Sequence, residues 1–347
     1  MRRLALILTI AALAASAPPA QAARNNTGGA IAQFLRIGAG ARALGMGDAY
    51  GPVAEGPNAI FWNPAGLGQM SRPELSYSHI EMLEFFHHEY VSYAHPVPFL
   101  KGTLGASMTF FYEDSLDLIT NTNKNIGGFS NHSEAFALSY GRGLRIGDDW
   151  GMEDRKYFDS LWRVGGAEMP LRPADDVWNG NLMIGLSGKF IRHTIHEYSA
   201  GTFAADGGVL FRHTYLPKLT MSFAFRNVGK NIKLIEQREG LPAEVAFGVS
   251  FDQRWERQRL LPALELSVPY YGTPSANLGV EYSFPVHYDS IVAVRAGFKT
   301  LQAVDLNAIS GLTGGVGYAY RHFNVNLGFQ PMAQLGGIYR IETGYRF

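Results

Sequence analysis

The chain has 347 residues, and its 30 lysine and arginine residues balance 30 aspartate and glutamate residues, so the formal net charge is zero. No strong basic field therefore points to nucleic acid as a partner. The chain has no cysteine, which excludes a disulfide framework and a zinc–thiolate site. Its length usually suggests two domains, although a barrel can absorb most of it as one.

The N-terminus has the three parts of a secretory signal peptide. Residues 1–3 are basic, residues 4–17 are apolar, and Ala20-Gln21-Ala22 supplies a small-residue cleavage site. The apolar stretch is too short to cross a hydrocarbon core about 30 Å thick as a helix, so we predict that residues 1–22 are removed during export. After Ala23 no window approaches the roughly 20 apolar residues of a membrane helix. A membrane location then requires a closed β-barrel.

Residues 23–72 are rich in small residues and do not alternate. Ile31, Phe34 and Leu35 suit one turn of an amphipathic helix. The G-x-G-x-x-A string at residues 38–43 brings a dinucleotide site into consideration, but such a site needs a βαβ unit, which the flanking sequence lacks. The small residues instead favour a compact segment inside a lumen. We predict a hatch, or plug, over residues 23–72.

From Pro73 onward, large apolar residues alternate with small, polar or charged ones. Leu104, Ala106 and Met108, for example, alternate with Gly105 and Ser107. One apolar face and one small or polar face is the pattern of a transmembrane barrel, with lipid outside and a lumen inside. We predict an all-β fold, a transmembrane antiparallel β-barrel of about 14 strands over residues 73–347. The predicted strands span residues 74–81, 86–96, 102–112, 133–143, 180–196, 201–212, 218–228, 243–252, 259–270, 275–284, 289–299, 312–321, 322–330 and 335–347.

A soluble sandwich or propeller would alternate as well. Its solvent face, however, would be rich in lysine and glutamate, whereas the second face here is dominated by Gly, Ala, Ser and Asn. Aromatic residues also lie toward predicted strand ends, as at Tyr112, Tyr140 and Phe284, where an interfacial girdle would place them. Both features favour the membrane barrel.

The loops follow the rule of short periplasmic turns and longer outer loops. With the C-terminus on the periplasmic side, the outer loops are residues 113–131, 229–240 and 300–311. Residues 144–179 are an exception, because this long insertion falls on the periplasmic side. A long insertion is more often functional or disordered than inert. Its tryptophans, Trp150, Trp162 and Trp178, are candidate partner contacts, unless they pack within the insertion or at the membrane surface.

Short motifs at both ends of the chain resemble a known family. They are F-L-R-I-G at residues 34–38, A-R-A-L-G-M-G-D-A at 41–49, W-N-P-A-G-L at 62–67, F-Q-P-M-A-Q-L-G at 329–336 and G-Y-R-F at 344–347. The motifs are similar to those of the FadL-type outer-membrane barrels and, more closely, of the PorV/PorQ branch of the type IX secretion system. The middle of the chain matches by pattern alone, and the 144–179 insertion does not align.

The resemblance implies that the N-terminal segment plugs the barrel. The plug motif comprises Arg42, Gly45, Gly47, Asp48, Asn58, Asn63, Pro64, Ala65 and Gly66. The Asn63 side chain suits a cap, and Pro64 removes a backbone donor that a packed lumen could not satisfy. Because buried charges need partners, we expect Arg42, Asp48 and Glu55 to pair with lumenal charges. The candidates are Lys189, Asp206, Arg226, Glu265, Glu281, Arg295 and Arg340.

The chain shows no catalytic constellation. It lacks a G-x-S-x-G motif, and its serines and carboxylates do not have the spacing of a triad or an acid–base pair. His87 and His88, like His193 and His196, point to opposite faces of a strand and cannot chelate a metal as a pair. We expect no enzyme activity, no cofactor and no metal site.

The closing strand ends on Tyr345 and Phe347, which face outward in the alternation. By resemblance to other outer-membrane barrels, these two residues are the predicted signal for the barrel-assembly machinery. The resemblance places the protein in the outer membrane, with lipid and that machinery as partners.

Three functions remain open. The main hypothesis is a component of protein export that binds the C-terminal domains of secreted cargo or a partner in the secretion machine. The alternative is a FadL-like conduit for hydrophobic small molecules, which needs a continuous apolar pocket from an outer loop. The polar lumen face and the short outer loops weigh against that alternative. The third hypothesis is a purely structural barrel.

Overall fold

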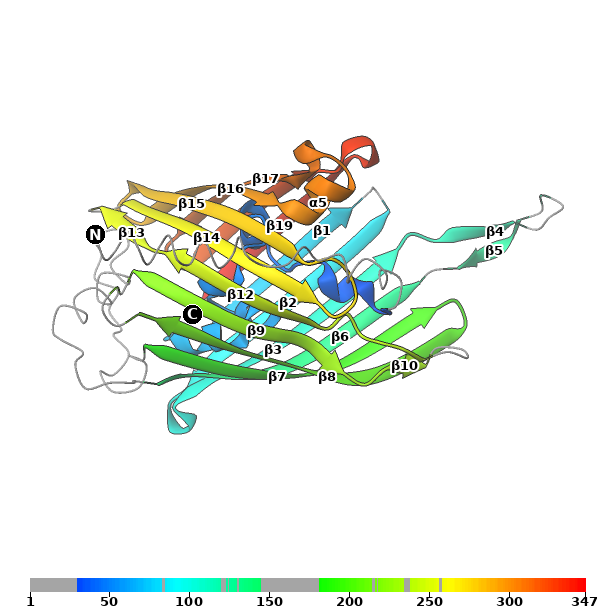
Figure 1. Ribbon diagram of the computed structural model, residues 1–347, viewed down its shortest axis with the longest axis horizontal. Helices are drawn as coiled ribbons and strands as arrows, with labels where there is room; N and C mark the ends of the chain where they lie inside the picture. Colours follow the sequence, from blue (N-terminus) through cyan, green and yellow to red (C-terminus); the bar gives the residue numbers. More distant parts are fainter. Residues whose placement is uncertain are drawn as a thin grey trace.

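Figure 1 shows a computed structural model of the chain, which describes residues 30–82, 85–119, 123, 125–129, 131–144, 181–213, 216, 218–233, 238–255 and 258–347. The predicted signal peptide lies outside the described residues. So does the 144–179 insertion apart from Leu144, and with it Trp150, Trp162 and Trp178.

The wall of the molecule is a β-barrel. Its strands are β1 (Glu74–Met82), β2 (Phe86–Val97), β3 (Gly102–Glu113), β6 (His132–Leu144), β7 (Leu182–Ile195), β8 (Tyr198–Arg212), β9 (Leu219–Gly229), β12 (Glu244–Phe251), β14 (Gln258–Pro269), β15 (Ser275–His287), β16 (Ser290–Lys299), β17 (Leu312–Tyr320), β18 (Phe323–Pro331) and β19 (Gly337–Arg346). In the described part of the chain these 14 strands form one antiparallel ring, closed by the pairing of β12 with β14. The prediction of about 14 strands is confirmed, and the predicted strand bounds differ from those observed by at most three residues.

The two ends of the barrel differ in their connections. The first and last strands pair side by side, from Glu74 with Arg346 to Met82 with Ile338, so the wall begins and ends at one end of the barrel, the terminal end. Apart from the connection between β6 and β7, which joins them at the terminal end, the longer connections are at the opposite end, the loop end, which lies to the right in Figure 1. These include the hairpin of β4 (Leu116–Ile119) with β5 (Asn125–Phe129), the pair β10 (Ile232–Lys233) and β11 (Arg238–Glu239), and the helix α5 (Thr300–Asp305).

The outer face of the ring is apolar. Leu138 and Leu186 are 73% and 66% exposed, whereas their strand neighbours Ser139 and Ser187 are buried. Because a closed ring leaves no edge strand, this apolar surface has the form that contacts lipid in a transmembrane barrel. Among the described residues no helix has the length and apolar character needed to cross a membrane.

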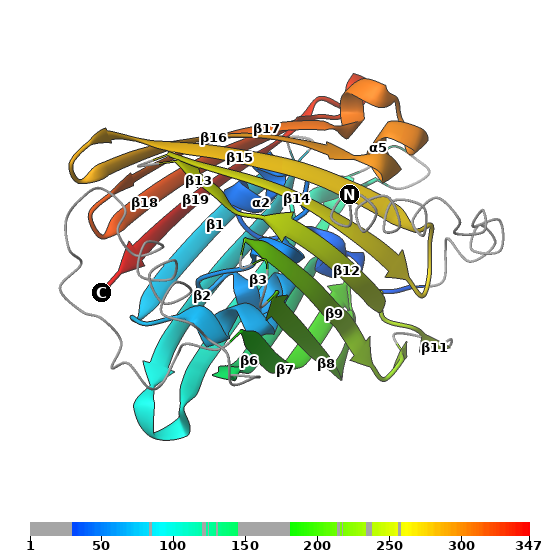
Figure 2. The same ribbon diagram turned by 60° about the vertical axis from the view of Figure 1, so that its left-hand side comes forward.

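The N-terminal segment occupies the lumen. We call its described part, residues 30–72, the hatch. Its short helices are η2 (Gln33–Arg36), α2 (Ala41–Gly45), η3 (Gly51–Val53), α3 (Ala59–Trp62) and η4 (Pro64–Gln69). The helix α2 contacts β16 to β19, η3 contacts β9, β12 and β14, and η4 contacts β3, β6, β7 and β8. The hatch, blue in Figure 2, therefore meets the wall on several sides of the ring.

Changing Phe347 to aspartate is expected to lower the amount of inserted barrel. The Phe347 ring packs against Tyr345, with centroids 4.8 Å apart, and its backbone N–H donates to the Pro73 carbonyl over 3.0 Å. Near the membrane interface a charge itself costs only about 0–1 kcal/mol, so a large loss would reflect recognition of the chain end. The heat-modifiable band of the protein in isolated outer membranes measures it.

Phe323→Asp is the matched control for this prediction. Phe323 lies at the same end of the barrel and also packs on Tyr345, with ring centroids 4.7 Å apart. If both variants insert equally well, or equally badly, Phe347 is not an assembly signal.

Candidate functional site: the hatch and the surrounding lumen

Glycines of the wall lie at the positions where hatch atoms come closest to the strands. A Cβ atom on Gly208 would lie 2.0 Å from Oδ1 of Asn63, one on Gly297 would lie 2.1 Å from the nitrogen of Gly47, and one on Gly185 would lie 2.2 Å from the carbonyl carbon of Pro64. Any larger residue would displace hatch backbone or a short side chain. Other wall glycines that meet the hatch are Gly105, Gly141, Gly248, Gly279, Gly315 and Gly328. The small residues on the lumen face of the strands therefore allow the hatch to pack directly against the wall.

The turn at Asn63 ties the hatch to the wall. Oδ1 of Asn63 accepts a hydrogen bond from the Ala65 backbone over 3.1 Å, and Nδ2 donates to the Val209 carbonyl of β8 over 3.2 Å. Pro64 is the first residue of η4, where a missing N–H costs no helical bond. The cap predicted from the sequence is present, and the same side chain also bonds the wall.

Two glycines of the plug motif are required by close approach, and a third, Gly45, is in tight contact. Gly47 has φ +64°, and a Cβ there would lie 2.6 Å from the Leu278 carbonyl oxygen. A Cβ on Gly66 would lie 2.4 Å from the Ala54 carbonyl oxygen within the hatch. Gly45 faces Gly315 across the α2 contact, at 3.1 Å from a hypothetical Cβ to the Gly315 Cα.

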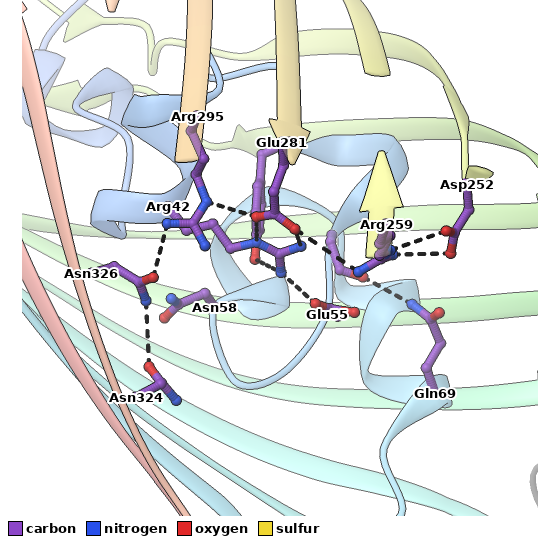
Figure 3. Close-up of polar contacts among 12 residues, drawn as sticks. Arg42, Glu55, Asn58, Gln69, Asp252, Arg259, Glu281, Arg295, Asn324 and Asn326 are labelled. Atoms are coloured by element: carbon purple, nitrogen blue, oxygen red, sulfur yellow. Dashed lines mark hydrogen bonds and ion pairs between the residues drawn. The ribbon is translucent and has the colours of Figure 1, made fainter. Parts of the chain in front are cut away.

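One charged cluster joins α2 to β15 and β16 (Figure 3). Nε and Nη2 of Arg42 donate to the two carboxylate oxygens of Glu281 over 2.7 and 3.0 Å. Glu281 also accepts from Nε of Arg295 over 2.6 Å. Arg42 additionally pairs with Glu55 of the hatch. Glu281 also pairs with Arg259 at 3.9 Å. A carboxylate of the wall is therefore shared between one cation of the hatch and two of the wall.

A second cluster lies around Asp48. Its carboxylate contacts Nζ of Lys299 at 2.5 Å and Nη1 of Arg340 at 3.2 Å. All three side chains are buried. The hatch thus supplies the anion here and the cation at Arg42, and both clusters attach α2 and its C-terminal turn to the β15–β19 side of the wall.

Further polar contacts fix the rest of the hatch. The Asn58 side chain donates to Glu342 over 2.8 Å, and the backbone N–H of Arg42 donates to the same carboxylate over 3.0 Å. On the other side, Arg226 donates to the Trp62 carbonyl over 2.7 Å and pairs with Glu265 at 2.7 Å. The hatch is held from opposite walls.

The cations shift the titration of the hatch carboxylates. Burial raises the pKa of Asp48, but Lys299 and Arg340 outweigh it and hold that pKa below the usual value of 3.8. Partial burial acts to raise the pKa of Glu55, whose side chain is still 49% exposed, and the Arg42 guanidinium outweighs it, so the pKa lies below the usual 4.5. Both groups are therefore ionised near neutral pH, which keeps the clusters intact.

The predicted charge pairing is largely confirmed. Arg42 pairs with Glu281 and Asp48 with Arg340, whereas Glu55 pairs with Arg42 inside the hatch rather than with a wall residue. Lys189 and Asp206 pair with each other at 2.5 Å. Lys299 was not among the candidates, and the alternation of Arg295, Gly297 and Lys299 on one face was the signal that could have found it.

The lumen is apolar at the loop end. Ile31, Phe34 and Leu35 of the hatch pack with buried residues of the wall and of the β9–β12 connection, which are Ala135, Ile191, Ala204, Ile232 and Leu241. The expectation of a polar lumen face is wrong at this end. At the loop end, the inward-facing positions of the wall strands carry Ala and Ile, as at Ala135 and Ile191. Nearer the terminal end, inward-facing positions of the same strands carry polar residues.

Four phenyl rings lead from the loop end to this apolar cluster. Phe85, 45% exposed beside the β1–β2 turn, contacts Phe86 with ring centroids 4.7 Å apart. Phe86 stacks on Phe111 at 5.8 Å, and Phe111 stacks on Phe34 of the hatch at 6.3 Å. We call these residues the phenyl file. It is a continuous run of ring contacts from a loop to the hatch.

The first histidine pair is arranged as the strand pattern predicts, whereas the second is not, because β7 ends at Ile195 and His196 lies in the following turn with φ +53°. His88 faces the lumen and is buried, while His87 faces the other way and contacts Asp114 at 3.3 Å. His193 contacts the Ser133 hydroxyl over 2.6 Å.

Comparison with solved structures identifies the fold. The toluene transporter TodX of Pseudomonas putida matches with a TM-score of 0.55 at 10% identity, over 89% of this chain and 98% of that chain. The toluene transporter TbuX of Ralstonia pickettii matches with a TM-score of 0.51 at 12% identity, over 89% and 98%. A FadL homologue of Pseudomonas aeruginosa matches with a TM-score of 0.50 at 10% identity, over 88% and 98%.

The fold is that of the FadL-type outer-membrane barrels. No family model matches the chain, and no curated protein matches it. The FadL-type resemblance read from the end motifs is therefore confirmed at the level of fold, and the PorV/PorQ branch has no support from these comparisons.

Proposed function

We propose that this protein is an outer-membrane conduit that takes up small apolar molecules, aromatic ones included, at its loop end. The observation that carries the proposal is the phenyl file, which joins an exposed loop residue, Phe85, to Phe34 of the hatch. Apolar solutes leave water for an apolar surface spontaneously, and aromatic solutes gain further from offset or edge contacts with phenyl rings.

The apolar cluster below the file is suited to hold such a solute. It is built from the hatch side chains Ile31 and Leu35 and from wall residues such as Ile191. Binding pockets for small molecules are typically lined in this way, with a few polar groups at the edge. A solute that reaches Phe34 is thereby placed next to the hatch, which separates it from the terminal end.

The fold supports this proposal. Toluene transporters are among the structures with the same fold, and at 10–12% identity the likeness concerns the fold alone. The polar lumen face predicted from the sequence counted against a conduit. The apolar cluster at the loop end now favours it.

The export hypothesis stays a prediction. It rests on the end motifs at residues 34–67 and 329–347, and its candidate contact residues Trp150, Trp162 and Trp178 lie outside the described residues. Capture of a secreted protein or a secretion-machine component by photocrosslinkers at these three positions would favour it.

Phe111→Ser is expected to slow toluene uptake. One aromatic contact is worth about 0.5–1.5 kcal/mol, which corresponds to a roughly two- to tenfold weaker interaction. Uptake of radiolabelled toluene is measured in cells that express the protein and lack other channels for apolar solutes.

Phe110→Ser is the control, since Phe110 lies next to Phe111 on β3 and points to the opposite face of the sheet. Wild-type cells that take up no more toluene than cells without the protein would contradict the conduit. Equal uptake by the two variants would contradict the role of the phenyl file.

A further inference from the structure

The loop end of the barrel has two sides that differ in charge. The charged side comprises the loop-end connections of β1 to β12, and its charged residues in the described part of the chain include Asp114, Asp117, Glu197, Lys230, Lys233, Arg238 and Glu239. The uncharged side, which includes α5 at the upper right of Figure 1, comprises the loop-end connections of β14 to β19. These are residues 270–274, 300–311 and 332–336, and they contain a single charged residue, Asp305. Because charged side chains are mostly placed in water, their near absence indicates that the uncharged side contacts something else.

Large apolar side chains are exposed on the uncharged side. Val304 of α5 is 81% exposed, and Ile309 of η6 (Ala308–Gly311) is 64% exposed. Leu335 of η7 (Ala333–Leu335) is 53% exposed. These residues lie on neighbouring connections, because η6 also contacts β18, the strand that leads to η7. Single exposed apolar residues are ordinary on a protein surface, whereas several on neighbouring connections mark a contact surface.

The exposed side chains continue the apolar outer face of the wall. Leu312, which begins β17 directly after η6, is exposed and lies opposite Phe298 of β16 in the strand register. A Cβ on Gly311 of η6 would lie 2.9 Å from the Phe298 ring, so η6 packs against an outward-facing side chain of the wall. On the next two strands the exposed rings of Phe329 and Tyr339 are in contact, with centroids 5.1 Å apart. The uncharged side is therefore an extension of the surface that has the form for contact with lipid.

The wall next to the charged side is polar on its outer face. Glu81 is exposed near the end of β1, and His79, two residues away, contacts Glu89 of β2 at 2.7 Å. His87 of β2 contacts Asp114 at 3.3 Å. A charge on the lipid face destabilises a barrel, and the cost grows with depth in the bilayer. The lipid-facing surface therefore ends further from the loops on the charged side than on the uncharged side.

We propose that the uncharged side of the loop end lies among the acyl chains of the outer leaflet, so that α5, η6 and η7 contact lipid together with the wall. Lipid is the occupant because no charged residue separates Ile309 from Leu312, or Phe329 from Leu335, along the chain. A membrane protein whose apolar surface is unequal in height fits the bilayer by tilting. The proposal does not depend on the conduit function, and it leaves Phe85, the first residue of the phenyl file, on the side that faces water.

The absence of cysteine allows a nitroxide to be attached at one chosen position. Val304→Cys and Ile309→Cys report on the uncharged side, and Glu197→Cys, at an exposed turn of the charged side, is the control. The full-length proteins are checked for heat-modifiability and reconstituted in phosphatidylcholine vesicles. Electron paramagnetic resonance then compares collisions of the label with oxygen, which is enriched among acyl chains, and with a water-soluble nickel chelate. We expect the ratio of oxygen to nickel collisions to be several-fold higher at residues 304 and 309 than at residue 197.

Two results of this measurement would overturn the proposal. A ratio at residues 304 and 309 as low as that at residue 197 would show that the uncharged side faces water in the membrane-embedded protein. Spectral broadening that disappears when the labelled protein is diluted with unlabelled protein would show that a second copy of the chain covers this side instead of lipid.

A second pair of variants needs no label. Ile309→Asp is expected to lower the midpoint of urea unfolding of the protein in vesicles, since the change puts a charge among acyl chains. Ser115→Asp, at an exposed position of the charged side, should leave the midpoint unchanged. Equal midpoints for the two variants would contradict the immersion of the uncharged side.

Discussion

Replacing Gly185 with valine is expected to prevent the hatch from packing against strand β7. A Cβ at this position would lie 2.2 Å from the Pro64 carbonyl carbon and 2.3 Å from the Ala65 nitrogen. Both are backbone atoms in a turn fixed by Asn63, so they cannot move aside as a flexible side chain could. Overpacking of this kind costs about 1–3 kcal/mol and occasionally more. The midpoint of urea unfolding and the conductance of the protein in planar bilayers measure the loss of stability and of the plug.

Gly188→Val is the matched control, because Gly188 lies on the same strand and a Cβ there meets no atom within 4 Å. The control should keep the wild-type midpoint and stay non-conducting. If Gly185→Val behaves as Gly188→Val does, the hatch does not press on the wall as described. Large, stable conductance from the wild-type protein would show that the hatch does not block the lumen at all.

Changing Asp48 to asparagine is expected to destabilise the protein strongly. The change leaves Lys299 and Arg340, both buried, without the carboxylate that they share. Removing one partner of a buried ion pair typically costs about 3–5 kcal/mol, because the remaining charge stays buried. The urea midpoint of the heat-modifiable protein measures the effect. Adding Lys299→Gln to Asp48→Asn should restore part of the loss, since it removes one of the two unpaired cations.

Asp289→Asn is the control for this experiment. It breaks the exposed pair with Arg321, which should change the midpoint little. A similarly small change for Asp48→Asn would show that the hatch charges do not hold it in place.

The same carboxylate predicts a loss of stability in acid. The pKa of Asp48 is lower in the folded protein than its usual 3.8, so its contribution is fully present above that value. It declines as the pH falls below 3.8 toward the folded-state pKa. The midpoint of Asp48→Asn should therefore vary less with pH in this range than that of the wild type.

The strands of the wall could be predicted from the sequence because the alternation of outward and inward residues is visible within each strand. A strand such as β9, with Phe223 and Phe225 outside and Arg226 inside, shows its two environments in a few consecutive residues. The hairpin of β4 and β5 was missed, since it extends beyond the barrel and no lipid face imposes the alternation there. The inward position of Phe111 was visible in the pattern of β3.

The lumen could not be predicted in the same way. Phe34 reaches Phe111 only because the hatch follows a particular path through the ring, and its short helices carry no period that specifies a path. The sequence indicates that the wall has small inward residues, yet it does not say that Gly208 faces Asn63 or that Gly297 faces Gly47.

The pairing of the first strand with the last fixes the size of the space that the hatch fills. The seam between Glu74 and Arg346 closes the ring, and the number and stagger of the strands in a closed ring fix its diameter. The hatch must therefore match a lumen whose width the wall alone determines. Glycine at inward positions such as Gly185, Gly208 and Gly297 widens that lumen locally, just where hatch atoms come closest.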